Sequence, residues 1–179
     1  MRNLDINILK ELCLTPGVSG VENESGITSV IYSLVKSFNK STEIDERGNV
    51  ISKIGKGSKK ILIDTHMDEV GFIVKAKVTE SKFLLESVGK IDINLVDGKK
   101  ICNLDLIELG ITHKEEDQLF LLLNKNVTTS VGEYLSFERS FGYDGATITA
   151  LALDNRIGCF TAINLISYFV DNSPKDSQL

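Results

Sequence analysis

The sequence predicts a mixed α/β chain that is interrupted by an inserted all-β module. Helical periodicity marks both ends of the chain, whereas runs of strand length separated by polar turns fill residues 72–141. Segments that carry candidate metal ligands come directly before and directly after those runs. We therefore expect an α/β domain of residues 1–70 and 145–179, and an inserted, barrel-like β module of residues 71–144.

The chain opens with two predicted helices. Apolar residues recur at helical spacing over residues 4–14, and the "TPG" of residues 15–17 ends this pattern. Ser19 lies three residues before Glu22, which is the spacing of a capping box at the start of a second helix. Its apolar face continues to about residue 38.

Strands are expected next. Residues 42–57 indicate two short strands around a turn at residues 47–49, and residues 61–63 indicate a buried strand. Six strand-like runs then form the β module: "FIVKAKV", "FLLESVG", "INLVDGKKI", "LDLIELGI", "QLFLLLN" and "EYLSFERS". After them, a buried strand at residues 148–151 should turn at "LDNR" into a final helix, whose apolar face carries Ile157, Phe160, Ile163, Ile166 and Phe169.

Composition narrows the class of protein. Of the 179 residues, 42% are hydrophobic and 25% charged, which is typical of a soluble globular protein. The net charge of −5 and the absence of a basic cluster argue against nucleic acid or a membrane as partner. The N-terminus lacks the apolar core of a signal peptide. Cys13, Cys102 and Cys159 are too far apart for a disulfide framework, which favours reduced thiols in a cytoplasmic protein.

His66 and Asp68 are candidates for a metal site at the end of the predicted strand. In extended backbone, side chains two residues apart point to the same side. Neutral imidazole is a preferred zinc ligand, and a nearby carboxylate commonly accepts its second ring N–H and orients it. The alternative is an ordinary hydrogen-bonded turn.

Asp154 holds a similar position where the second predicted strand meets the final helix. Its carboxylate could bridge two cations, or it could simply cap the helix as an Asp at the N-cap does. In the first case Arg156 would balance negative charge or hold a neighbouring carboxylate.

Taken in order, "TPGVSGVE", "GNVI", "ILIDTHMDEVGF" and "LALDNRIG" make a more specific pattern. The chain resembles the glutamyl or deblocking aminopeptidases, the tetrahedral-aminopeptidase family of co-catalytic zinc exopeptidases. The resemblance implies a zinc-exopeptidase-like mixed sheet and a β module that serves as lid and dimerisation element. It also implies peptide substrates, two divalent metal ions (Zn or Co), and homo-oligomers built through the β module. His66 would be a metal ligand, Asp68 its orienting catalytic aspartate, and Asp154 the bridging ligand.

The chain also departs from this family. Asn155 stands where the family has a second Asp, and Leu151 stands where it has a Lys. The Glu-Glu pair, the Asp and the C-terminal His that complete the family's site are not found in these 179 residues. We therefore expect little or no aminopeptidase activity from this chain alone. Glu115 and Glu116, beside His113, precede Asp154 and are predicted to be a solvated hairpin turn.

Two other functions remain open. One is a related two-zinc exopeptidase or deacylase with the same order of ligands. The other is a non-catalytic interaction or scaffold protein, in which the β module binds a partner.

Overall fold

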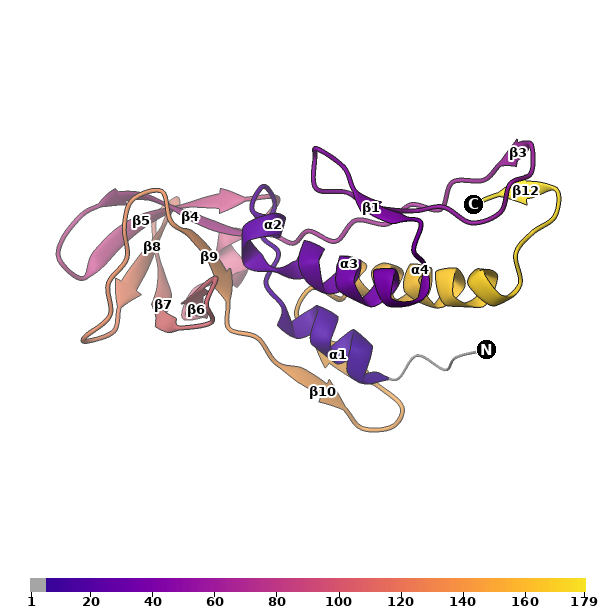
Figure 1. Ribbon diagram of the computed structural model, residues 1–179. Helices are drawn as coiled ribbons and strands as arrows, with labels where there is room; N and C mark the ends of the chain where they lie inside the picture. The colour runs from indigo at the N-terminus through magenta and orange to yellow at the C-terminus, as the bar shows by residue number, and fades with distance from the viewer. Residues whose placement is uncertain (1–5) are drawn as a thin grey trace. The chain divides into compact units, whose positions relative to one another are not determined.

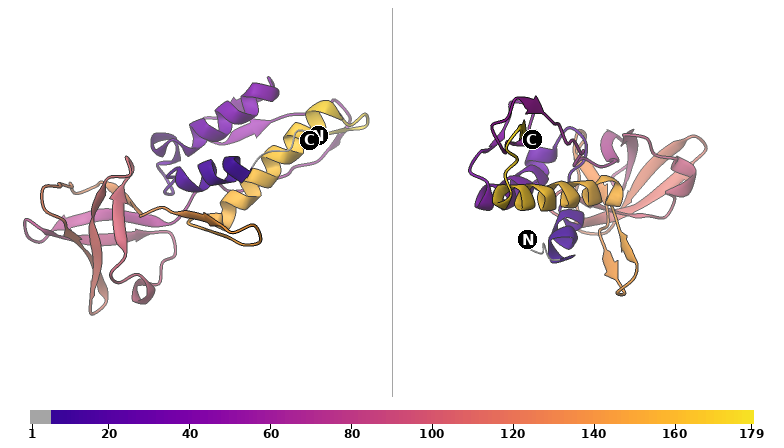
Figure 2. Two further views of the ribbon diagram at one scale, coloured as in Figure 1. Left: turned by 90° about the horizontal axis from the view of Figure 1, so that it is seen from below. Right: turned by 90° about the vertical axis from the view of Figure 1, so that its right-hand side faces the viewer.

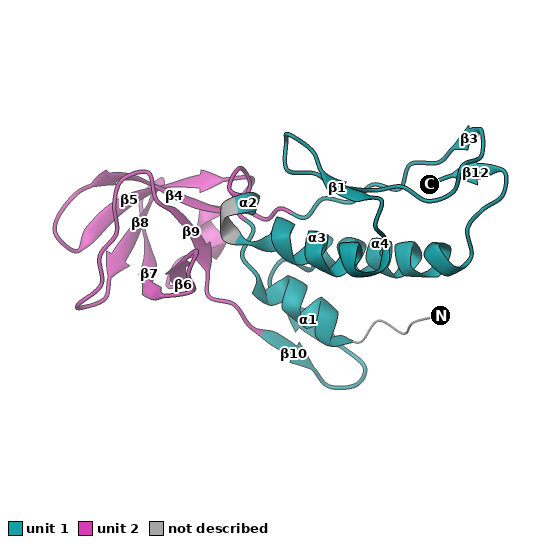
Figure 3. Cartoon of the chain, viewed as in Figure 1, with its two compact units in different colours: residues 1–17, 22–67, 141–179 teal, residues 18–21, 68–140 magenta. Residues whose placement is uncertain are grey.

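A computed structural model describes residues 6–179, apart from the side chains of residues 24 and 25 (Figure 1). The start of the first predicted helix, at residues 4 and 5, lies outside the described residues. The chain divides into two compact units (Figure 3). The first unit contains residues 1–17, 22–67 and 141–179, and the second contains residues 18–21 and 68–140.

Helices supply most of the core of the first unit. They are α1 (Ile6–Leu14), α2 (Glu22–Ser25), α3 (Ile27–Phe38) and α4 (Leu153–Asp171). Apolar side chains at helical spacing bring α1, α3 and α4 together, as two views show (Figures 1 and 2). Their shared core consists of Leu12, Ile27, Ile31, Val35, Cys159 and Ile163. The helical predictions for both ends of the chain are thus confirmed.

Three two-stranded sheets complete the first unit. The predicted hairpin is present as β1 (Thr42–Ile44) and β2 (Val50–Ser52). A second hairpin pairs β10 (Phe141–Tyr143) with β11 (Ile148–Ala150). The third sheet pairs β3 (Lys59–Lys60) in parallel with β12 (Ser177–Gln178), so the last residues of the chain lie beside residues 59 and 60.

The prediction of a buried strand at residues 61–63 is wrong. This segment lies outside any strand, and Ile61, Leu62 and Ile63 are 49%, 90% and 49% exposed. The pairing of β3 with β12 stops at Lys60 and Gln178, so no further strand of the described chain covers these aliphatic side chains. The strand at residues 148–151 is likewise only partly buried, because β11 has a single partner in its hairpin.

The predicted capping box is also wrong. The Ser19 hydroxyl donates a hydrogen bond to the Asp68 carboxylate, within the second unit, and not to the start of a helix. The helical stretch that follows is divided at Gly26, whose φ of 95° is accessible to glycine and unfavourable for other residues. The result is a short α2 followed by α3.

The second unit is a closed, antiparallel six-stranded barrel, which confirms the predicted β module as a barrel. The strands follow the order β4-β5-β8-β7-β6-β9, and β9 pairs with β4 to close it. Their bounds are β4 (Gly71–Lys77), β5 (Lys82–Val88), β6 (Lys100–Asn103), β7 (Glu108–Glu115), β8 (Gln118–Leu123) and β9 (Tyr134–Phe137). Where "INLVDGKKI" was expected to be one strand, a 3₁₀ turn, η1 (Ile93–Leu95), precedes β6.

Apolar side chains that alternate along the strands fill the interior of the barrel. Every second residue points inward, so Phe72 and Val74 of β4 meet Phe83 and Leu85 of β5 in one core. The other buried members are Ile101, Leu109, Leu119, Leu121 and Leu135. Among residues 6–179, no helix is long and apolar enough to cross a bilayer.

Candidate metal centre

The structure brings together two of the predicted metal ligands. His66 Nε2 lies 3.2 Å from Asp154 Oδ1, although the two residues are 88 positions apart in the chain. Both side chains are open to solvent, with 53% of His66 and 96% of Asp154 exposed. The pair therefore lies where a small ligand can reach it from the surface of the first unit.

The backbone around Asp154 explains how its side chain reaches outward. Asp154 (φ −88°, ψ 101°) and Asn155 (φ −124°, ψ 42°) are not helical, so the regular turns of α4 begin at Arg156. Asn155 caps these turns, because its side-chain Oδ1 accepts a hydrogen bond from Gly158 N at 3.0 Å. The capping role that was considered for Asp154 thus falls to its neighbour.

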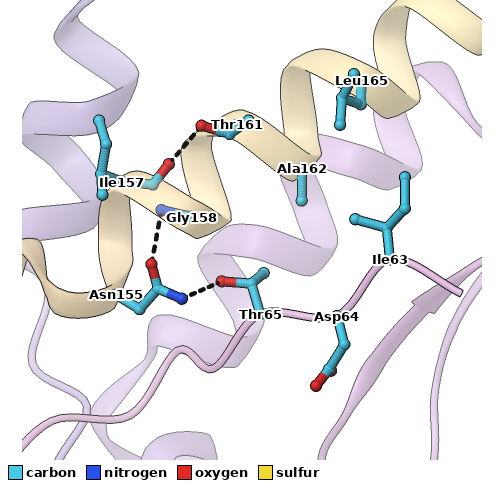
Figure 4. A pocket seen from close by; sticks show the side chains of 9 residues that line it. All are labelled: Ile63, Asp64, Thr65, Asn155, Ile157, Gly158, Thr161, Ala162 and Leu165. Carbon is cyan, nitrogen blue, oxygen red and sulfur yellow. Dashed lines mark hydrogen bonds between the residues drawn. The ribbon is translucent and has the colours of Figure 1, made fainter.

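Hydrogen bonds within the first unit hold residues 65 and 66 against the beginning of α4. Asn155 Nδ2 donates to Thr65 Oγ1 at 2.9 Å, and Cys159 Sγ donates to the His66 carbonyl at 3.3 Å. Figure 4 shows the Asn155 side chain between Thr65 and Gly158. These contacts fix the backbone on either side of the His66–Asp154 pair.

A hollow of about 280 Å³ lies next to this junction (Figure 4). It runs along the first turns of α4 and the extended segment that precedes His66. Its lining is mostly apolar: Ile63, Asp64, Thr65, Asn155, Ile157, Gly158, Thr161, Ala162 and Leu165. Ile157, which was predicted to face the core, is 44% exposed at this surface.

Asp68, the third predicted site residue, belongs to the second unit. Its carboxylate accepts the hydrogen bond from Ser19, and the Ser19 hydroxyl also lies 3.3 Å from the Glu69 carbonyl. The Ser19 N–H donates to that same carbonyl at 3.0 Å, which anchors residues 18–21 to the segment that holds Asp68. Asp68 is therefore held by local contacts at the edge of the barrel unit.

The pair of Glu69 and Arg139 was not identified from the sequence. Their side chains form an ion pair in the interior of the second unit, each 3% exposed, and Arg139 Nη2 also lies 3.2 Å from Ser136 Oγ. The sequence near either residue gives no sign that the two pair, because they are 70 positions apart. Only the closure of the barrel brings them together.

Arg156 lies in the interior of the first unit and bonds to another helix. Its side chain is fully buried, and Nη1 donates a hydrogen bond to the Leu12 carbonyl at 2.8 Å. This carbonyl lies in the last turn of α1, where a cation is favourable next to the negative end of the helix dipole. Arg156 thus joins α4 to α1.

His113 and the Glu115–Glu116 pair lie in the second unit. His113 and Glu115 belong to β7, and Glu116 forms the turn that follows. A hydrogen bond from Lys82 lowers the pKa of the Glu115 carboxyl. Glu115 forms a surface ion pair with Lys82 and lies 3.4 Å from His113 Nε2, whereas Glu116 is exposed in the turn of the β7–β8 hairpin, so the predicted turn begins one residue later than expected.

The donor atoms of His66 and Asp154 fit one divalent ion. Two donors bound to zinc at about 2.1 Å in tetrahedral geometry lie about 3.4 Å apart, close to the observed 3.2 Å. Catalytic zinc sites generally take three protein ligands. The described part of the chain holds no group of three or more His, Cys, Asp or Glu side chains arranged for a metal ion. It thus supplies two ligands of such a site.

Comparison with known proteins shows similarity to aminopeptidases. Residues 48–105 match the family described as M42 glutamyl aminopeptidase. The chain is 26% identical over 190 residues to FrvX of Escherichia coli (strain K12), a protein provisionally named an aminopeptidase. That alignment covers 91% of this chain and 52% of FrvX.

Solved structures show the same fold. An endoglucanase from Thermotoga maritima superposes with a TM-score of 0.79 at 30% identity, over 95% of this chain and 57% of that one. The TET1 peptidase of Pyrococcus horikoshii, which can assemble into a tetrahedron or a large octahedral shell, superposes with a TM-score of 0.79 at 23% identity. The latter match covers 97% of this chain and 59% of TET1, and it supports the fold alone.

The chain spans about half the length of the curated relatives it matches. Residues 48–105 are similar to the M42 glutamyl aminopeptidases, and most of the chain is similar to proteins named as aminopeptidases.

Proposed function

We propose that the protein is a metal-dependent aminopeptidase that hydrolyses N-terminal residues from peptides. The observation that carries the proposal is the 3.2 Å separation of His66 Nε2 and Asp154 Oδ1, an imidazole and a carboxylate that face each other at the surface. The similarity of residues 48–105 to the M42 glutamyl aminopeptidases supports the same conclusion.

Each site residue has a distinct role in this proposal. His66 would be a ligand of a divalent ion, zinc or cobalt, and Asp154 would be the carboxylate ligand shared between that ion and a second one. Asp68, two residues along the chain from His66, is the carboxylate that orients the imidazole. When bound, the two ions would lower the pKa of a water molecule and polarise the scissile carbonyl.

Metal binding by the full chain tests this assignment. Isothermal titration with Co²⁺ should detect binding by the wild type, and His66→Ala or Asp154→Ala should weaken it by about tenfold or more. His113→Ala is the matched control, because His113 is the other histidine of the chain and lies in the barrel. Equal losses in His66→Ala and His113→Ala, or no binding by the wild type, would contradict the proposal.

Residues 1–179 by themselves are expected to have little or no aminopeptidase activity. Two protein ligands leave the site too open, since three per metal are usual in catalytic zinc sites. An assay with leucine p-nitroanilide and added Co²⁺ checks this. Turnover by this chain at a rate typical of enzymes, roughly 1 s⁻¹ or more, would refute the expectation.

The proposed setting follows from the family. The substrates are peptides, the compartment is the cytoplasm, and the protein forms homo-oligomers through the barrel of the second unit, which also acts as a lid. TET1, which shares the fold, can assemble into a tetrahedron or a large octahedral shell, and the proposed oligomer is an analogy with that protein. Light scattering of the purified chain should then give a mass of at least a dimer, and a monomer at all concentrations would oppose this part.

Three other functions compete with this one. The exposed aliphatic side chains of residues 61–63 favour an interaction or scaffold protein, because exposed apolar patches commonly bind partners. A related two-zinc exopeptidase or deacylase would use the same ligands. Endoglucanase, the name of the Thermotoga neighbour, is less compatible with the site, since glycoside hydrolysis typically uses two carboxyl groups and here an imidazole faces one carboxylate.

A further inference from the structure

The contacts around Asn155 suggest what sets the geometry of the His66–Asp154 pair. The two ligands come from different parts of the first unit, an extended segment and the non-helical start of α4. Both are exposed, so packing against a core does not hold their side chains. Other contacts must therefore hold the segment around His66 next to the start of α4.

Asn155 joins those two backbones with a single side chain. Its Oδ1 accepts from Gly158 N at 3.0 Å and so belongs to the first turn of α4. Its Nδ2 donates to Thr65 Oγ1 at 2.9 Å and so holds the residue before His66. An amide is suited to this, because it offers an acceptor and a donor on one planar group.

The close approach of the two segments is visible at Gly158. A Cβ atom at this position would lie 2.2 Å from Asn155 Oδ1 and 2.5 Å from Thr65 Oγ1, far inside van der Waals contact. Glycine is unfavourable in a helix, so its presence in the first turn of α4 needs a reason. The reason here is space for the Asn155–Thr65 hydrogen bond (Figure 4).

A second contact acts on the ligand residue itself. Cys159 Sγ donates to the His66 carbonyl at 3.3 Å, one residue after the glycine. The segment is therefore held at Thr65 and at His66 by consecutive parts of the same helical turn.

We propose that Asn155 and Thr65 are positioning residues, which set the separation of His66 from Asp154 and thereby the affinity of the pair for a divalent ion. This rests on the proposed metal-binding function and extends it to two residues that do not bind the metal. Thr65 and Asn155 act through His66 and Asp154, their immediate neighbours in the chain.

Conservative variants of the full chain separate positioning from simple stability. Thr65→Val keeps the shape and removes the hydroxyl, whereas Thr65→Ser keeps the hydroxyl. Asn155→Ala removes both hydrogen bonds, whereas Asn155→Asp keeps two acceptor oxygens, to which Gly158 N–H and the Thr65 hydroxyl can donate. Thr161→Val is the matched control, since Thr161 lines the same hollow but its hydroxyl bonds to the Ile157 carbonyl of its own helix.

Co²⁺ titration followed by visible absorption is the first measurement. Thr65→Val and Asn155→Ala should bind Co²⁺ about tenfold more weakly and with an altered spectrum, while Thr65→Ser, Asn155→Asp and Thr161→Val should resemble the wild type. If the wild type binds and Thr65→Val binds equally well, the positioning role is wrong and the metal site stands.

If the wild type binds no Co²⁺, the proposed function fails. Amide hydrogen exchange then still tests whether Thr65 and Asn155 hold the segment around His66. Thr65→Val and Asn155→Ala should then accelerate amide exchange over residues 64–67, compared with the wild type and with Thr161→Val. Such an acceleration would support the conclusion that the Asn155–Thr65 hydrogen bond positions His66. Unchanged exchange in both variants would overturn the inference independently of metal binding.

Discussion

Asn155 shows how much a single residue decides in this protein. It caps the regular part of α4 and holds Thr65, the neighbour of His66. Asp154 is thereby left free of the capping role and points its carboxylate at the imidazole. The orientation of the candidate ligand depends on this arrangement, in which Asn155 bonds to the helix and Asp154 remains beside His66.

Gly158→Ala tests this local geometry through stability. Helix propensity alone favours the variant by about 1 kcal/mol. The added methyl group would overlap Asn155 Oδ1 and Thr65 Oγ1, and overpacking of this kind costs about 1–3 kcal/mol. We expect steric overlap to dominate, so that Gly158→Ala lowers the free energy of unfolding measured with urea.

Thr161→Ala, at an exposed site on the same helix, provides the control for propensity. It should be neutral within about 0.5 kcal/mol. A stabilised Gly158→Ala variant would mean that the segment of residues 63–65 does not lie against α4 in solution.

At the scale of elements, charged side chains link β6 of the barrel to β7 and to Glu138, the residue directly after β9. Lys100 of β6 lies 2.9 Å from a Glu108 oxygen and 3.1 Å from a Glu138 oxygen. Hydrogen bonds from Lys100, and then from Asn124, lower the pKa of Glu108, whereas those to Glu108 and Glu138 raise the pKa of Lys100. The lysine thus connects neighbouring strands through ionised carboxylates.

Stability should therefore fall in acid. The pKa of Glu108 is lower in the folded protein than in the unfolded chain, so its contribution is complete above the ordinary carboxyl pKa of 4.5 and is lost as the pH falls through the folded value. Thermal unfolding between pH 7 and pH 3 should show a smaller decline in Lys100→Met than in the wild type. An identical pH profile in the two proteins would show that this surface pair contributes nothing measurable.

At the scale of the whole molecule, each of the two units has its own hydrophobic core. The second unit is closed on itself, because β9 pairs with both β4 and β6 and leaves no free sheet edge. The first unit is less complete: its strands form three separate pairs, and residues 61–63 remain exposed. The barrel is thus the more self-sufficient of the two.

We predict that a fragment of residues 68–140 folds by itself. Its closed strand pairing and shared core do not require the first unit. Circular dichroism and NMR should show a cooperative thermal transition and dispersed amide signals. Phe72→Ala in the same fragment should abolish both, because removing a fully buried Phe costs about 3–5 kcal/mol, comparable to the stability of a small domain. A fragment without a cooperative transition would contradict the prediction.

The sequence by itself determined the elements whose signal is local. Periodicity over a few turns predicted α1, α3 and α4, alternation predicted the barrel strands, and a turn motif predicted the hairpin of β1 and β2. It also singled out His66 and Asp154, because a strand-like run and a helix start each delivered one ionisable group in a distinctive order. The signal for each helix or strand comes from neighbouring residues, whereas the two candidate ligands were identified from the order of motifs along the chain.

Tertiary structure alone decided which distant groups meet. The 3.2 Å contact of His66 with Asp154, the turn of Arg156 toward α1 and the pairing of Glu69 with Arg139 join residues 70 to 144 positions apart. It also decided burial: residues 61–63 have the composition of a core strand, yet they are exposed because no strand of the described chain pairs beside them. Burial and long-range contacts belong to the packing of whole elements, whereas a sequence pattern records only the preference of each segment for a helix, a strand or a turn.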